Sequence, residues 1–83
     1  MRLIHVYTQN SDGNIGHFFS YAIIDEQLAD DVVEQAEAKF IEIAEKYDTD
    51  EEMIKIGLED GWLRFTNGVW LQFMWNDAEN VQI

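Results

Sequence analysis

The sequence predicts an α+β fold in which one long amphipathic helix packs on one face of a four-stranded antiparallel sheet, in the order ββα(α)ββ. Residues 26–47 repeat apolar side chains with a helical period, and the stretches on either side of this segment alternate in the manner of two hairpins. A chain of 83 residues is too short to divide its core, so a single domain over residues 1–83 is expected. Residues 76–83 are polar and are expected to form a loose tail.

The first hairpin is predicted from the N-terminal residues. Residues 2–8 alternate two apolar sets, which suits a strand covered on most of both faces. Residues 10–14, Asn-Ser-Asp-Gly-Asn, favour a chain reversal. A second strand is then expected from about His17 to Ile24, again with apolar groups on both sides.

The central helix is predicted from Glu26 to Tyr47, with Asp25 as its N-cap and Glu26 at the positive end of its dipole. At about 100° per residue its side chains divide into two sectors. The apolar sector contains Leu28, Ala29, Val32, Val33, Ala36, Phe40, Ile43, Ala44 and Tyr47, and the acidic sector contains Asp30, Asp31, Glu34, Glu37, Glu42 and Glu45. Lys39 and Lys46 stand at the edge of the apolar sector.

Residues 50–58 permit two interpretations. Thr49 and Glu52 have the spacing of a capping box, which predicts a second short helix to about Leu58. In the alternative, residues 54–58 form a fifth strand that turns at Asp60-Gly61. Gly57 disfavours both interpretations.

The last hairpin is predicted from Trp62–Thr66 and Val69–Trp75, joined by a two-residue turn at Asn67-Gly68. This turn pairs Thr66 with Val69, Arg64 with Leu71 and Trp62 with Phe73. A single helix leaves one sheet face open, which exposes either the set Trp70 and Met74 or the set Val69, Leu71, Phe73 and Trp75. An exposed apolar patch of this size usually meets a partner, and a homodimer is the simplest case.

The composition excludes several functional classes. Seventeen acidic and five basic residues give a formal charge of −12, which disfavours direct binding of nucleic acid or an anionic membrane and favours a basic partner. There is no cysteine for a disulfide, a zinc site or a thiol nucleophile. We find neither a secretory leader nor an apolar stretch of about 18 residues, so a cytoplasmic location is expected.

We expect no enzymatic activity, metal or cofactor. His5 and His17 could approach each other across the first hairpin, but no third ligand has a recognisable spacing to them. Pairs of carboxylates such as Glu59 with Asp60 are uninformative in so acidic a chain. No serine lies in a nucleophile motif, and no glycine cluster forms a phosphate-binding loop.

The acidic helix face is the candidate binding site. Its six carboxylates are spread over about 22 Å of helix, roughly one per 4 Å, which is close to the one phosphate per ~3.4 Å of a nucleic-acid strand. Trp70 and Trp75 are proposed as an aromatic patch that supplies a desolvated contact. The full set of predicted acidic contacts is Asp30, Asp31, Glu34, Glu37, Glu42, Glu45, Asp48, Asp50, Glu51 and Glu52.

These features lead to three functional hypotheses. The first is a small inhibitor that occupies the basic nucleic-acid-handling surface of another protein, as nucleic-acid mimics of the anti-CRISPR or anti-restriction type from phages and mobile elements do. The second is an immunity protein or antitoxin that neutralises one basic nuclease. The third is a homo-oligomeric structural or adaptor domain whose acidic residues serve only solubility.

Overall fold

The computed structural model describes residues 2–65 and 67–77 and shows one layer of strands and one layer of helices. The elements are the strands β1 (Arg2–Gln9) and β2 (Ile15–Ile23), the 3-10 helix η1 (Glu26–Leu28), the helices α1 (Ala29–Lys46) and α2 (Glu51–Asp60), and the strands β3 (Trp62–Arg64) and β4 (Trp70–Asp77). The strands form one antiparallel sheet in the order β2-β1-β4-β3. The predicted α+β class and element order are confirmed.

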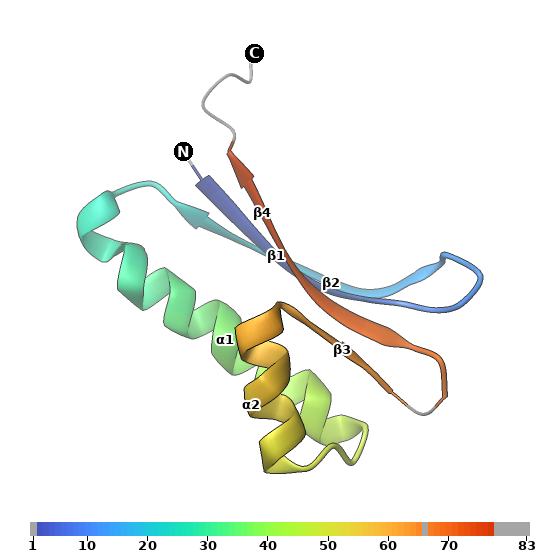
Figure 1. Cartoon of the computed structure of the whole chain (residues 1–83). Helices are drawn as coiled ribbons and strands as arrows, with labels where there is room; N and C mark the ends of the chain where they lie inside the picture. Colours follow the sequence, from blue (N-terminus) through green and yellow to red (C-terminus); the bar gives the residue numbers. More distant parts are fainter. Residues whose placement is uncertain (1, 66, 78–83) are drawn as a thin grey trace.

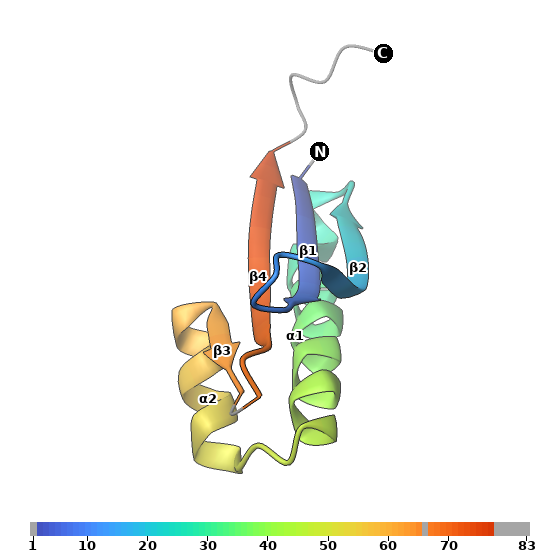
Figure 2. The same cartoon turned by 90° about the vertical axis from the view of Figure 1, so that its right-hand side faces the viewer.

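Both helices lie on the same side of the sheet (Figure 1), and the view turned by 90° separates α2 from α1 along that side (Figure 2). The core fills the space between them and the covered sheet face. Phe40 of α1 is fully buried, and its ring stacks on Phe73 of β4 with centroids 4.6 Å apart. Tyr47 stacks in the same way on Phe65, at 4.2 Å. The predicted apolar stripe from Ala29 onward is therefore the surface that α1 packs on the sheet. The prediction is wrong for Leu28, which lies in η1 and is 53% exposed.

The second helix is α2, so the alternative with a fifth strand is wrong. Its N-cap is Asp50 rather than Thr49: the Asp50 carboxylate accepts a hydrogen bond from the Met53 backbone N–H at 2.9 Å. The helix ends at Gly61, which adopts a left-handed conformation with φ 87°. The residues predicted to turn a hairpin therefore end a helix instead.

Gly57 is where α2 meets β3. It is buried, and a Cβ atom placed on it would lie 2.3 Å from Cγ of Leu63. A glycine inside a helix ordinarily weakens the helix. Here the missing side chain allows the helix backbone to lie directly against the buried Leu63. Gly57 disfavours a helix by its intrinsic propensity, but the close packing of α2 on β3 requires a glycine at this position.

The predicted two-residue turn between the last two strands is wrong. The Phe65 N–H donates to the Val69 carbonyl at 2.8 Å, and the Gly68 N–H donates to the Phe65 carbonyl at 3.0 Å. The paired residues that flank the turn are therefore Phe65 and Val69 rather than Thr66 and Val69, and Gly68 adopts φ 84°. This difference shifts the register by one, so Trp62 pairs with Gln72, Leu63 with Leu71 and Arg64 with Trp70. Thr66 lies outside the described residues.

A bulge interrupts the first hairpin, because Tyr7 pairs with Phe18 whereas Gln9 pairs with Ile15. The hydroxyl of the buried Thr8 accepts the His17 N–H at 2.9 Å. This bond provides a partner for a backbone group at the irregularity in the ladder.

The sheet face turned away from the helices carries no helix within the described residues, and we call it the open face. Strand alternation and the observed register place Trp70 and Met74 on this face, whereas Leu71 and Phe73 point toward the helices. Of the predicted tail, residues 76 and 77 belong to β4, and residues 78–83 lie outside the described residues. The open face consists of Leu3, His5, Tyr7, Gln9, Ile15, Phe18, Ser20, Ala22, Trp62, Arg64, Trp70, Gln72, Met74 and Asn76.

Candidate functional site: an acidic helical layer

The negative charge of this protein is concentrated in the layer of helices. Fourteen of the seventeen Asp and Glu residues lie between residues 25 and 60, together with three of the five basic residues. This segment comprises η1, α1, α2 and their connections. The charge is therefore distributed unequally between the two sides of the molecule.

The amphipathic α1 positions the central part of this charge. Its buried residues are Ala36, Phe40, Ile43 and Ala44, and at about 100° per residue the six acids of the helix fall within an arc of about 140° on the other side. Five of these acids are exposed. Glu37, at the margin of the arc nearest the core, is only partly exposed.

The connection from α1 to α2 continues the acidic surface. Asp48, Asp50, Glu51 and Glu52 are exposed there. Asp50 caps α2, and Glu51 and Glu52 stand in its first turn, where the helix dipole favours negative charge. These three acids consequently contribute to the formation of α2 as well as to the surface charge. All ten predicted acidic contacts lie on α1, on the connection or in the first turn of α2.

Two ion pairs neutralise part of the acidic charge. Lys39 Nζ lies 2.6 Å from Glu42 Oε2 on the surface of α1. This hydrogen bond and the attraction between the two charges lower the pKa of Glu42 below its ordinary 4.5, and Glu42 in turn raises the pKa of Lys39. The Lys39 ammonium also lies 4.6 Å from the ring centroid of Phe19. Lys39 therefore neutralises Glu42 at the edge of the acidic arc, between Glu37 and Glu45 along α1.

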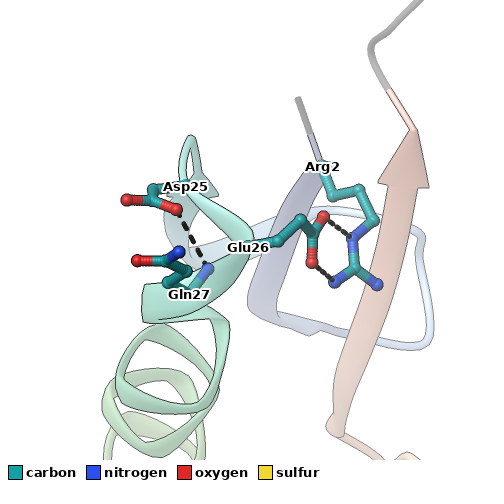
Figure 3. Close-up of polar contacts among 4 residues, drawn as sticks. All are labelled: Arg2, Asp25, Glu26 and Gln27. Carbon is teal, nitrogen blue, oxygen red and sulfur yellow. Dashed lines mark hydrogen bonds and ion pairs between the residues drawn. The ribbon is translucent and has the colours of Figure 1, made fainter.

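The second ion pair joins the start of the helical segment to the sheet. Arg2 donates two hydrogen bonds to Glu26, at 3.1 and 2.7 Å, and the neighbouring Asp25 carboxylate accepts the Gln27 N–H at 3.0 Å (Figure 3). Arg2 also lies over the ring of Trp75, 5.4 Å from its centroid. The predicted capping role of Asp25 is confirmed, although the cap serves η1 rather than α1.

The two predicted aromatic anchors do not form one patch. Trp70 lies on the open face, where its ring is 5.1 Å from that of Trp62 and 5.4 Å from the Arg64 guanidinium carbon. Trp75 pairs with the buried Ile4 and points to the helical side, where it is 53% exposed. The two tryptophans are five positions apart in one strand, so alternation places them on opposite faces.

The two histidines are also on opposite faces. His5 lies on the open face, with Nδ1 2.6 Å from the Ser20 hydroxyl oxygen. His17 lies two residues before Phe19 on the other side of β2 and stacks on that ring at 6.4 Å. Residues 2–65 and 67–77 contain no group of three or more His, Cys, Asp or Glu arranged to hold a metal ion.

A groove between α1, the end of α2 and β4 brings together residues that the sequence did not connect. Its volume is about 490 Å³. Glu37, Glu59 and Asp60 line it together with Trp62 and Trp75. In the sequence, Glu59 and Asp60 are uninformative because acids are abundant, and their approach to Glu37 depends on how α2 packs against the sheet. No periodicity or spacing in the sequence reports that crossing.

Comparison with protein-family models, with curated proteins and with solved structures gives no match for this chain. Among the helices of the described part of the chain, none is both long and apolar enough to cross a membrane.

Proposed function

We propose that this protein is a small inhibitor that binds the basic, nucleic-acid-handling surface of another protein through its acidic layer. The observation that supports the proposal is the separation of charge between the two sides of the molecule. Residues 25–60 carry fourteen acidic and three basic residues, whereas the open face carries no carboxylate. Net negative charge keeps a protein soluble wherever the acids lie, so solubility does not require them to be on one side. A surface that competes with nucleic acid does require its acids to be gathered on one side.

The mechanism is competitive. Arg and Lys side chains that normally contact phosphates pair with carboxylates between residues 30 and 52 of the acidic layer, and the partner can no longer bind nucleic acid. Because Lys39 neutralises Glu42 on α1, the layer presents two acidic groups, whose nearest members, Glu37 and Glu45, lie about 12 Å apart along the helix. The first group consists of Asp30, Asp31, Glu34 and Glu37, and the second consists of Glu45, Asp48, Glu51 and Glu52.

The alternating arrangement of charge suits a partner with two basic clusters more than a uniformly basic groove. Each exposed ion pair contributes little, about 0.2–1 kcal/mol. Several pairs acting together are therefore needed for specific binding. Binding that depends on them should weaken as salt screens the charges.

The experiment compares two variants with the same net charge. In the site variant, Asp31→Asn, Glu34→Gln and Glu45→Gln remove three exposed carboxylates from α1. In the control variant, Asp12→Asn, Glu59→Gln and Asp60→Asn remove three exposed carboxylates outside the two acidic groups. Both variants keep side chains of nearly the same shape, so circular dichroism should show the same fold for both.

The immobilised protein is used at low salt to capture binding proteins from cells that carry its gene, and each captured protein is then purified. The proposal expects a basic nucleic-acid-binding protein that is released by salt and displaced by duplex DNA or RNA. Loss of three pairs should weaken its binding to the site variant about 10–100-fold, with little change for the control. Equal binding by the two variants, or a complex that nucleic acid does not displace, would contradict the proposal. Capture of one dedicated nuclease would instead favour the immunity-protein hypothesis.

A further inference from the structure

The open face is an apolar and aromatic surface without a covering element in the described part of the chain. Phe18 is 51% exposed, Trp62 46% and Met74 44%. Phe18 packs against His5 and Tyr7, with ring centroids 5.1 and 5.9 Å away. Trp62 and Trp70 form a second pair of rings on the same face, across β3 and β4. Large apolar side chains therefore extend across all four strands.

The charge of the open face differs from that of the rest of the molecule. None of its fourteen side chains is a carboxylate, although the chain contains seventeen Asp and Glu residues. Its arginine, Arg64, lies over the Trp70 ring, with its guanidinium carbon 5.4 Å from the centroid. A basic partner finds no carboxylate here, and the face offers only a single cation to an acidic partner. A neutral surface of this kind is complementary to itself.

We propose that the open face binds a second copy of this chain, with the two sheets packed face to face around a twofold axis. Packed sheets lie about 10 Å apart, and each helical layer lies outside its own sheet. The two acidic layers are then separated by two sheets and the space between them, roughly 30 Å from one helix layer to the other. This distance is several times the ~8 Å Debye length at physiological salt, so the repulsion between the layers is largely screened. Contact through the helices would instead bring the acidic layers together.

The size of the face is consistent with a weak, reversible dimer. Strands β1, β2 and β4 lie about 4.8 Å apart and share about six residues of length, and β3 adds three residues, which gives a projected area of roughly 330 Å² for each copy. Two copies together contribute about 670 Å² before the uneven surface of the side chains is counted, which is below the ~1,000 Å² of a stable interface and in the range of weak, transient contacts. Dissociation should therefore be visible within the micromolar range of protein concentration.

The response of the complex to salt distinguishes a dimer of this chain from a complex with a basic protein. Two copies of a chain with charge −12 repel each other, so added salt should strengthen the dimer. A complex held by attraction between the acidic layer and a basic protein should weaken under the same change. The two proposals therefore predict opposite responses, and either can fail without the other.

The test uses analytical ultracentrifugation of the full chain from about 1 to 500 μM, in low and moderate salt, with two matched variants. Met74→Glu places a carboxylate on the open face, and Met53→Glu places the same group on α2. The native side chains are exposed to nearly the same extent, 44% and 45%. We expect the wild type and Met53→Glu to dimerise with similar dissociation constants. Met74→Glu should weaken the dimer at least tenfold.

Two results of this experiment would overturn the proposal. A wild type that stays monomeric at 500 μM in moderate salt overturns the proposal, even if another protein is found to bind the open face. A dimer that Met53→Glu disrupts and Met74→Glu does not also overturns it. Should Met74→Glu fail to fold by circular dichroism, Phe18→Glu serves in its place, because Phe18 is half exposed on the opposite side of the same face.

Discussion

The packing of α2 on β3 can be tested by adding one methyl group at Gly57. In Gly57→Ala, the new Cβ would lie 2.3 Å from Cγ of Leu63 and 2.7 and 2.9 Å from its two Cδ atoms. Ordinary carbon contacts are about 3.5–4.0 Å. The overlap with Cγ therefore exceeds 1 Å, and Leu63, which is only 3% exposed, has no free space into which to withdraw. Either Leu63 leaves its position or α2 moves away from the sheet.

Two effects of opposite sign determine the result. Replacing glycine by alanine inside a helix normally stabilises it by about 0.5–1 kcal/mol. Overpacking a well-filled core costs about 1–3 kcal/mol and occasionally more. With an overlap this large we expect the second effect to dominate, giving a net loss of about 1–2 kcal/mol. In a domain of this size, such a loss lowers the melting temperature by roughly 4–16 °C.

Urea denaturation, followed by tryptophan fluorescence, measures the free energy of unfolding of four proteins: the wild type, the two single variants and the double variant Gly57→Ala/Leu63→Ala. Leu63→Ala alone should cost about 2–5 kcal/mol. With Leu63 truncated, the methyl group at position 57 no longer overlaps with it, so Gly57→Ala should then be neutral or stabilising. A Gly57→Ala variant that is more stable than the wild type would refute the claim that close packing fixes α2.

Three further measurements test other parts of the structure. Thr8→Val removes the acceptor of the His17 N–H and should cost about 1 kcal/mol or more in urea denaturation, whereas Thr8→Ser should retain most of that stability. Asp50→Ala removes the cap of α2 and should cost about 0.5–2 kcal/mol, whereas Asp50→Asn keeps an acceptor and should cost less. Raising NaCl from about 0.02 to 0.5 M should increase the melting temperature, because salt screens repulsion within the acidic layer; an unchanged or lower value would contradict this explanation.

The sequence predicted the elements whose signals are local. The stripe that buries Phe40 and Ala44 has a period of 3.6 residues, and this pattern is visible without knowledge of the partner surface. The prediction failed where the outcome depended on one residue of loop length. Asn67-Gly68 fits a two-residue turn and also the end of a three-residue connection, and only the pairing of Phe65 with Val69 distinguishes them.

The candidate site was predictable to a similar degree. The exposure of the acids on α1 followed from periodicity, and the structure places nearly all of them in solvent. The pairing of Lys39 with Glu42 has the i,i+3 spacing that the sequence already contains. The separation of Trp70 from Trp75 follows from alternation along one strand. In contrast, the groove formed by Glu37, Glu59 and Asp60 required the crossing of α2, which long-range packing determines.

The separation of the two faces gives the protein two surfaces that should respond to salt in opposite ways. The acidic layer projects from the helices, and the open face is apolar and free of carboxylates. If the open faces pair, the two acidic layers point in opposite directions, away from the interface. Each copy then keeps its acidic groups accessible to a basic partner while the apolar side chains are removed from water. A charge reversal on α1 should therefore affect the basic partner without abolishing the dimer, and Met74→Glu should do the reverse.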